Sequence, residues 1–247
     1  MNQNIRYITE VAILTAMITV LGAIKIPNVI PGIEFQLSAP LAVAICAVFG
    51  FKKYIISGCL SSLIGLALGT QTIETERLIL RRFVETDAQA MFDNWASRSE
   101  NLTYVTWNPH LNVEQTRNSI GNWVKSYDNP NYYKWAICLK ENPPQVIGDI
   151  SLVSVDEENS SCEIGYILGM DYWGRGLMTE ALKAVLSYCL DEIGFEEVDA
   201  CYASLNPASG RVMEKAGMTF WKTIPNAVER KGYVADKIYY QIKKAVG

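Results

Sequence analysis

The chain has 247 residues, enough for one large domain or two small ones, and a formal net charge of −4 at pH 7. This acidic balance argues against nucleic acid as the main partner. Six cysteines and a single histidine offer no zinc-ligand spacing, because no C-x-x-C pair is present. We therefore expect buried free thiols in a reducing compartment and no bound metal.

The first 70 residues are strongly apolar. They hold four basic and two acidic side chains, and they contain three apolar runs, over residues 8–24, 37–51 and 54–68. A straight span needs about 20 residues to cross a bilayer, so the first run nearly qualifies and the others fit a tight hairpin or tilted half-spans. A signal peptide fits poorly, because only one basic residue precedes the first run and no small-residue cleavage site follows it. The sequence predicts an all-α, membrane-like segment over residues 1–70 with lipid contact through residues 8–69; a buried helical hairpin is the alternative.

A soluble domain is expected over residues 71–247, and it opens with a strand over 76–84. Thr86 and Gln89 have the spacing of a capping box that starts a helix, on which Met91 and Trp95 lie one turn apart. A second helix is expected over 112–127. One face of it carries Val113, Thr116, Ile120, Trp123 and Tyr127.

The rest of the domain combines strands with two further helices. Expected strands cover residues 133–139, 146–154, 162–168, 198–204, 218–223 and 233–242. The helices cover 179–193 and 208–216, and each is stopped by a glycine, Gly194 as a left-handed cap and then Gly217. The predicted order is therefore β-α-α-β-β-β-α-β-α-β-β.

The most informative stretch is DYWGRGLMTEAL, residues 171–182. Gly174 and Gly176 lie between an expected strand and an expected helix. Glycine lets a backbone approach a phosphate closely, and the free N–H groups of a first helical turn face negative charge. A second signal follows in Asn206-Pro207-Ala208-Ser209 and in residues 214–217. Together these signals indicate an enzyme that holds a phosphorylated cofactor.

At these positions the domain resembles the GNAT superfamily of acyl-CoA N-acyltransferases, in the branch that acetylates ribosomal-protein N-termini. The resemblance is carried by TERLILRRF, EIGYILGMDYWGRGLMTEAL and NPASGRVMEKAGM, over residues 72–242. It implies an α/β (α+β) fold, a mixed twisted sheet flanked by helices, with acetyl-CoA as co-substrate. Trp173 agrees with this branch. Met178 replaces a small residue and is expected to crowd the pyrophosphate entrance, and Met213 stands where many members have a tyrosine that acts as general acid.

The resemblance also implies a cofactor site between the strands at 162–168 and 198–204. The pyrophosphate would meet Trp173, Gly174, Arg175, Gly176, Leu177, Met178 and Thr179, largely through backbone N–H groups. Arg175 would add a charge-assisted contact, or it is a solvated turn arginine. Pantetheine would pair with the strand edge at Tyr166, Ile167 and Leu168, where a backbone N–H polarises the thioester carbonyl. Asn206 would bond the pantetheine amides or order its turn.

Two residues are candidates for catalysis and three for the acceptor pocket. Glu163 is the candidate base that deprotonates the amine, with a paired structural carboxylate as the alternative. Ser209 is the candidate acid or orienting group for the thiolate, with helix capping as the alternative. Trp95, Tyr104 and Trp107 are candidate pocket residues, with core packing as the alternative, most of all for Trp95. His110 is expected at the surface.

The leading function is acetyl transfer from acetyl-CoA to a primary amine, either a protein N-terminus or a small amine, in a cytoplasmic catalytic domain. Residues 1–70 resemble a truncated substrate-binding component of an energy-coupling-factor transporter, through AILTAM, IPNVIPGIEFQLSAPLAV and ISGCLSSLIGLALG. This segment would associate the protein with a membrane, although Lys52-Lys53 inside would place a domain after a third span outside. Alternatives are a transport or scaffold protein that only binds CoA or a partner, and a fusion whose first 70 residues have no function.

Overall fold

A computed structural model describes Tyr7, Glu10, residues 25–26 and 35–36, and then residues 72–141, 145–230 and 232–244. The chain divides into two compact units, Met1–Gln71 and Thr72–Gly247. In the first unit, β1 (Lys25–Ile26) pairs antiparallel with β2 (Phe35–Gln36). The membrane-like runs expected over residues 8–69 lie almost wholly outside the described residues. Within the part of the chain that is described, no helix combines the length and apolar character needed to cross a bilayer.

The second unit is built on an eight-stranded sheet of order β3-β4-β5-β6-β7-β8-β10-β9. The first five strands in this order are β3 (Ile73–Glu74), β4 (Leu78–Arg81), β5 (Lys134–Leu139), β6 (Gln145–Asp156) and β7 (Ser161–Leu168). The last three are β8 (Glu197–Ala203), β10 (Tyr233–Lys243) and β9 (Thr219–Arg230). The mixed sheet flanked by helices confirms the fold class expected for residues 71–247, whereas β1 and β2 are strands in a segment that was expected to be all-α.

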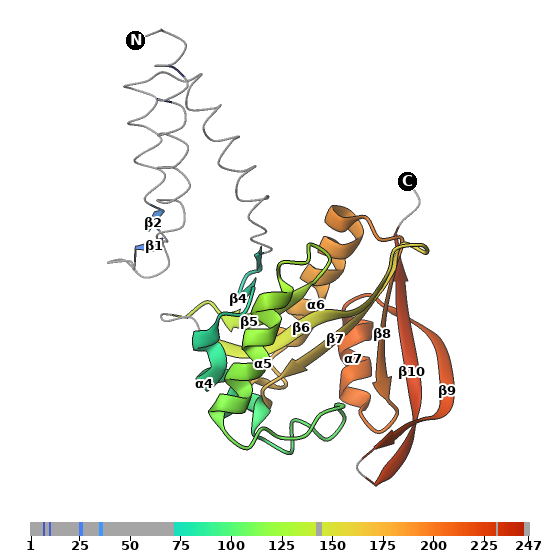
Figure 1. Cartoon of the computed structure of the whole chain (residues 1–247). Helices are drawn as coiled ribbons and strands as arrows, with labels where there is room; N and C mark the ends of the chain where they lie inside the picture. Colours follow the sequence, from blue (N-terminus) through green and yellow to red (C-terminus); the bar gives the residue numbers. More distant parts are fainter. Residues whose placement is uncertain are drawn as a thin grey trace. The chain divides into compact units, whose positions relative to one another are not determined.

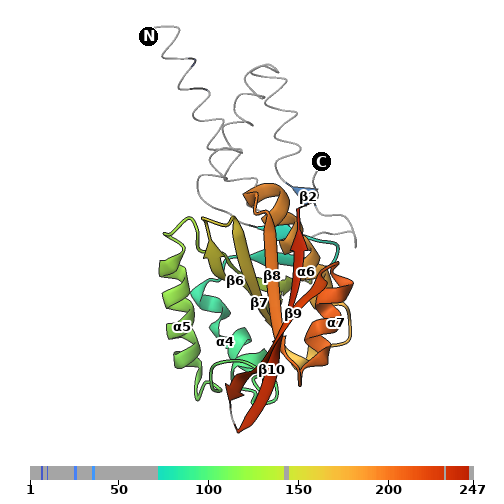
Figure 2. The same ribbon diagram turned by 90° about the vertical axis from the view of Figure 1, so that its right-hand side faces the viewer.

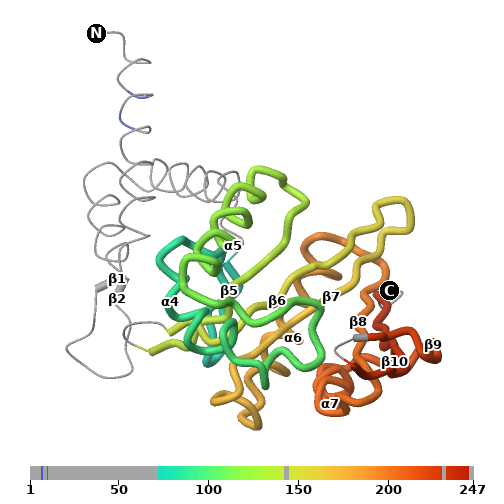
Figure 3. Tube along the Cα trace, turned by 60° about the horizontal axis from the view of Figure 1, so that its bottom comes forward, coloured from blue at the N-terminus to red at the C-terminus, as the bar shows by residue number. Residues whose placement is uncertain are grey.

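Helices cover both faces of this sheet (Figures 1 and 2). On one face lie η1 (Glu85–Asp87), α4 (Ala88–Met91), the π-helical η2 (Phe92–Ala96) and α5 (Val113–Ser126). On the other face lie α6 (Leu177–Ser187), its π-helical continuation η4 (Tyr188–Ile193) and α7 (Pro207–Lys215). Each set of helices buries its own apolar core against the sheet, centred on Trp95 in the first and on Ile164 and Leu182 in the second. Figure 3 shows β9 and β10 at the opposite end of this unit from α4.

Several local predictions are confirmed. Helix α5 lies where a second helix was expected; its cap, which was not predicted, is Asn112, whose side-chain oxygen accepts the Gln115 N–H at 2.9 Å. Gly194 ends η4 with φ of 93° and Gly217 follows α7 with φ of 98°. Both angles lie in the left-handed region that favours glycine.

The predicted capping box at Thr86 and Gln89 is wrong. The residue that satisfies the start of this segment is Asp87, whose carboxylate accepts the Val84 N–H at 2.9 Å and binds Arg81 through two hydrogen bonds of 2.8 Å. Gln89 instead donates to Asp93, one turn further along. A charged partner on β4 therefore replaces the local cap that the spacing suggested, and the sequence spacing could not show that partner.

Candidate functional site

The centre of the candidate site is the point where β7 and β8 separate. Of the neighbouring strands that the structure describes, these two alone run parallel, and they pair only from Ser161 with Glu197 to Ile164 with Ala200. β7 continues to Leu168 in register with β6 on its other side. The β8-facing edge of residues 165–168 thus has no strand partner among the described residues. Main-chain groups on such an edge are available to an extended ligand.

Two side chains from outside β7, one before it and one after it in the chain, already occupy this edge at Leu168. The Leu168 carbonyl oxygen accepts a hydrogen bond of 2.7 Å from the Asn101 amide and another of 2.7 Å from the Trp173 indole N–H. Trp173 thereby fixes the chain just beyond β7, while just over half of its side-chain surface stays exposed. Of the three residues expected to pair with pantetheine, Tyr166 directs its main-chain groups to this edge without such contacts, whereas Ile167 directs its own toward its partner strand β6.

The glycine turn has the geometry that an anion site requires. Gly174 and Gly176 have φ of 74° and 75°, and no atom lies within 4 Å of where a Cβ on Gly174 would stand. Gly176 is the N-cap of α6 and no side chain caps the helix there. The first N–H groups of α6, from Leu177 to Thr179, therefore have no intrahelical partner, and they carry the positive end of the helix dipole.

The expectation that Met178 crowds this turn is wrong. Its side chain is 6 % exposed and packs with Leu177 and Leu182 in the core beneath α6. The second residue of the helix points toward the sheet, so its bulk leaves the turn open and its N–H faces outward with the others. Arg175 is bound within its own turn, where it donates to the Asp171 carbonyl at 2.9 Å and lies 5.4 Å from the centre of the Tyr172 ring.

Glu163 lies one residue before Ile164, the last residue of β7 that pairs with β8. Its neighbours Cys162 and Ile164 face the α6 core, so the Glu163 side chain lies on the opposite face of the sheet. The Cys201 thiol donates to Oε1 at 3.2 Å and the Lys237 ammonium lies 3.9 Å from the same oxygen. Burial, together with the Glu163 charge, raises the pKa of Cys201 to about 12, so this thiol is a neutral donor.

Ser209 lies in the first turn of α7, where its own N–H donates to the Asn206 carbonyl at 3.1 Å. The Tyr166 hydroxyl crosses from β7 to reach the Ser209 carbonyl at 3.0 Å and the Ser209 hydroxyl at 2.9 Å. Burial raises the pKa of Tyr166, which keeps its phenol neutral. The Asn206 side chain makes no cap bond. The structure thus brings Tyr166 and Ser209 together at the separation of the two strands.

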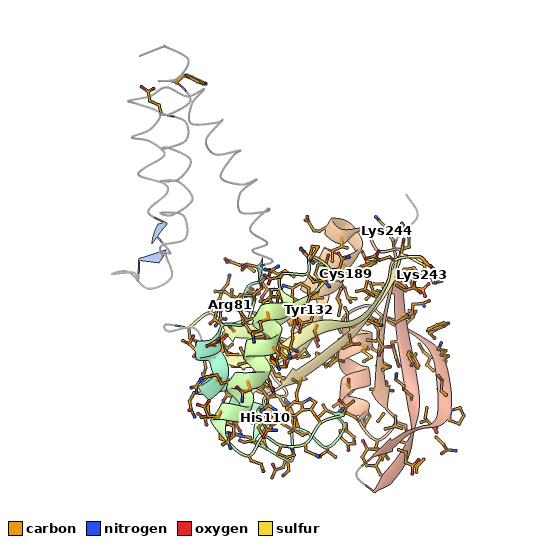
Figure 4. The ribbon with its side chains drawn as sticks, viewed as in Figure 1. Arg81, His110, Tyr132, Cys189, Lys243 and Lys244 are labelled. Carbon is orange, nitrogen blue, oxygen red and sulfur yellow. The ribbon has the colours of Figure 1, made fainter. Side chains whose placement is uncertain are left out.

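The three candidate pocket residues separate in the structure. Trp95 is completely buried in the core against α4 and α5, which favours the alternative of core packing. Tyr104 is exposed and packs edge-on against Tyr233 of the β9–β10 hairpin, with ring centres 6.1 Å apart. Trp107 is half-buried, and its ring centre lies 5.2 Å from that of His110. His110 lies near the start of α5 (Figure 4).

Sequence reasoning missed the partners of these residues. These partners lie on later strands and belong to no sequence motif: Cys201 on β8, and Tyr233 and Lys237 on β10. The Tyr166 hydroxyl was also missed, because only its backbone was assigned a role. Strand alternation could have placed Tyr166 on the buried face, but the contact with Ser209 depends on how α7 packs.

An uncapped helix start, a glycine turn with open space and a strand edge without a partner fit the pyrophosphate and pantetheine of an acyl-CoA. They define the site of an acyl-CoA-dependent transferase. A family model described as "Acetyltransferase (GNAT) domain" matches residues 77–219, and the chain belongs to this family. It is an acetyl-CoA-dependent N-acetyltransferase.

Curated relatives match the chain over two different lengths. "Uncharacterized N-acetyltransferase YoaA" of Bacillus subtilis (strain 168) is 27% identical over 172 residues, which are 70% of this chain and 96% of that protein. "Protein BioX" of Lysinibacillus sphaericus is 53% identical over 66 residues, 27% of this chain, so the match spans only 40% of that relative's length. The predicted resemblance of residues 1–70 to a transporter component gains no support from these matches.

Solved structures share the fold. An acetyltransferase (GNAT family) from Bacillus anthracis has a TM-score of 0.61 and 26% identity, with 70% of this chain and 98% of that chain covered. RimL, described as a ribosomal L7/L12 α-N-protein acetyltransferase in complex with coenzyme A, has a TM-score of 0.62 and 19% identity over 70% of this chain and 98% of that chain.

Proposed function

We propose that residues 71–247 form a catalytic domain that acetylates a primary amine, either a protein N-terminus or a small amine. The observation that carries this proposal is the position of Glu163, a carboxylate where β7 and β8 stop pairing, on the face of the sheet away from α6. The proposed base and the helix that follows the phosphate-binding turn thus lie on opposite faces of the sheet, at the point where β7 and β8 separate. This arrangement lets an amine approach from the face opposite the helix that holds the cofactor.

The main chain supplies most of the proposed cofactor contacts. Backbone N–H groups from Gly174 to Thr179 would hold the pyrophosphate, with the dipole of α6 behind them. The free edge at Tyr166 would pair with pantetheine, and Asn206 would lie beside it. Acetyl-CoA, when bound, supplies an acetyl group activated as a thioester.

Glu163 would accept the proton that makes the acceptor nucleophilic. A protonated amine has no lone pair, so a carboxylate must remove its proton, directly or through a water. Cys201 and Lys237 bind one carboxylate oxygen and leave the other for this task. Because the Cys201 thiol is neutral, it orients the carboxylate without competing for the proton.

Ser209 would donate a hydrogen bond to the departing sulfur. A thiol titrates near about 8.5, so a hydrogen bond is enough to stabilise the thiolate until solvent supplies a proton. Tyr166 can keep its bond to the Ser209 carbonyl while the Ser209 hydroxyl turns toward the sulfur. This pair would take over the role of the general-acid tyrosine that many family members have where this chain has Met213.

The acceptor would enter beside the contact between residues 103–104 and the β9–β10 hairpin. There Tyr104 packs on Tyr233, and the Tyr233 hydroxyl donates to the Thr103 carbonyl at 3.3 Å. An aromatic pair of this kind, with Tyr104 exposed and Tyr233 half-buried at the start of β10, can adapt to a peptide terminus. Structural likeness to RimL and the sequence resemblance to its branch support a protein N-terminus as one of the two acceptor classes.

The apolar runs of residues 1–70 support lipid contact through residues 8–69. Two spans, a re-entrant third segment or the reversed orientation would leave the catalytic domain on the cytoplasmic side. Fractionation of cells that express the full chain tests this part. Recovery in the membrane pellet, and release by detergent but not by high salt, is the expected result. Full recovery of the chain in the supernatant contradicts it.

Steady-state kinetics with acetyl-CoA and a panel of peptides and small amines tests the catalytic proposal. Glu163→Gln should reduce kcat on every acceptor used, and Glu158→Gln, an exposed change in the β6–β7 turn, should not. Equal activity of the two variants would remove Glu163 from the mechanism.

A further inference from the structure

The start of α6 is tied to the beginning of the acetyltransferase unit by one carboxylate. Glu180 accepts hydrogen bonds from the Thr75 hydroxyl at 2.6 Å, the Arg77 N–H at 2.8 Å and the Arg77 Nε at 2.7 Å. The Arg77 Nη2 atom also lies 2.7 Å from Glu180 Oε2. Burial works against the charged form, but the hydrogen bonds from Thr75 and Arg77 lower the pKa of Glu180, which keeps it ionised.

The same arginine reaches the glycine turn. Its Nη1 atom donates to the Arg175 carbonyl at 2.9 Å, and its Nη2 atom lies 3.7 Å from where a Cβ on Gly176 would stand. The Glu180 N–H in turn donates to the Gly176 carbonyl at 3.1 Å. One guanidinium therefore joins the turn and the helix. The Arg175 carbonyl and the Gly176 carbonyl each accept a hydrogen bond from a fixed donor.

Fixing these carbonyls fixes the N–H groups that follow them, because each peptide unit is planar. The Arg175 carbonyl and the Gly176 N–H belong to one peptide unit, so the bond from Arg77 sets the direction in which that N–H points. The Arg175 side chain is held by Asp171 and Tyr172 and does not provide this contact. The Arg77 side chain is 45 % exposed, so part of its charge stays open beside the turn.

We infer that Arg77 is a positioning residue for the phosphate-binding turn: through its bond to the Arg175 carbonyl it aligns the N–H groups of residues 176–179 on the pyrophosphate. The inference rests on the proposed cofactor contacts of that turn. A guanidinium suits this task, because its fork of donors serves the Glu180 carboxylate and the Arg175 carbonyl at once. An ammonium can serve only one of them well.

Calorimetric titration of the full chain with coenzyme A tests the inference by affinity, independently of turnover. Arg77→Met should weaken binding about tenfold, the effect of losing one charge-assisted contact. Arg77→Lys, which keeps the charge but cannot serve both acceptors, should stay within about twofold of Arg77→Met. The matched control is Arg117→Met, which removes an arginine paired with Glu114 on the exposed face of α5 and should bind like the parent chain.

Two further readouts separate positioning from a general loss of structure. At saturating acetyl-CoA the kcat of Arg77→Met should equal that of the parent chain, so that the change is confined to KM for acetyl-CoA. Affinity for coenzyme A that is unchanged in Arg77→Met, or fully restored by Arg77→Lys, overturns the inference. Absence of binding by the parent chain would instead overturn the proposed function on which it rests.

Discussion

The Gly176→Ala substitution tests the phosphate-binding turn with the smallest possible change. The backbone at Gly176 has φ of 75°, and the nearest atom to an added Cβ would be the Arg77 Nη2 at 3.7 Å, an ordinary contact. Space is therefore available, and the cost of the alanine is almost entirely conformational. Placing an L-residue in the left-handed region costs about 1–2 kcal/mol.

This cost has a measurable size in unfolding. For a unit of this length, each kcal/mol lowers Tm by roughly 2–4 °C, so Gly176→Ala should lower it by about 2–8 °C. All six tryptophans lie in residues 72–247, so tryptophan fluorescence follows the acetyltransferase unit alone. Gly217→Ala is the matched control. Gly217 has φ of 98° and no atom within 4 Å of an added Cβ, but it follows the C-terminal end of α7 and lies outside the proposed phosphate site.

The two variants should differ in ligand affinity. To relieve its strain, the alanine at position 176 must rotate the N–H groups that face the phosphates, and a hydrogen bond to a charged group contributes about 1.5–3 kcal/mol. Gly176→Ala should therefore weaken coenzyme A binding about tenfold or more, and Gly217→Ala should leave it unchanged at a similar loss of Tm. Affinities within twofold of each other for the two variants would refute the assignment of this turn.

Three further outcomes are expected. Glu163→Gln should lower kcat by roughly 100-fold while coenzyme A affinity stays the same, and a similar loss of affinity would show a structural role instead. Ser209→Ala should lower kcat by roughly tenfold and Tyr166→Phe by less, because Tyr166 acts through Ser209; the reverse order would make the phenol the direct donor. Burial lowers the pKa of His110, so the unfolded chain takes up a proton first as the pH falls below about 6.5. Stability against urea should therefore decline from pH 7.5 to pH 5.5, and His110→Gln should reduce that decline; an identical decline in both proteins would contradict the reasoning.

Features set by neighbouring residues in the chain could be predicted from the sequence. The glycines that end two helices, Gly194 and Gly217, and the turn at Gly174 and Gly176 depend on local backbone chemistry, and the structure has them where the pattern placed them. The order of strands and helices followed from periodicity for the same reason. The short strand β3, the 3-10 helix at Met170–Tyr172 and the full length of β9 were missed, and the strand expected over 76–84 is limited to Leu78–Arg81.

Features set by distant residues could not be predicted. Asp87 replaced the expected cap because Arg81 lies beside it in space, and Met178 turned into the core because α6 packs on the sheet. Trp95 occupied the core for a similar reason. The partners of Glu163 are Cys201 on β8 and Lys237 on β10, at least 38 residues away along the chain, and no local pattern marks either of them.

The central claim is that this chain moves an acetyl group from acetyl-CoA to an amine with the help of Glu163. The most direct measurement is mass spectrometry of an acceptor panel, with peptides and small amines incubated with acetyl-CoA and either the full chain or Glu163→Gln. At least one amine should gain the mass of one acetyl group with the full chain, and the gain should be at least tenfold slower with the variant. Release of coenzyme A without acetylation of any amine, or equal acetylation by the two proteins, would contradict it.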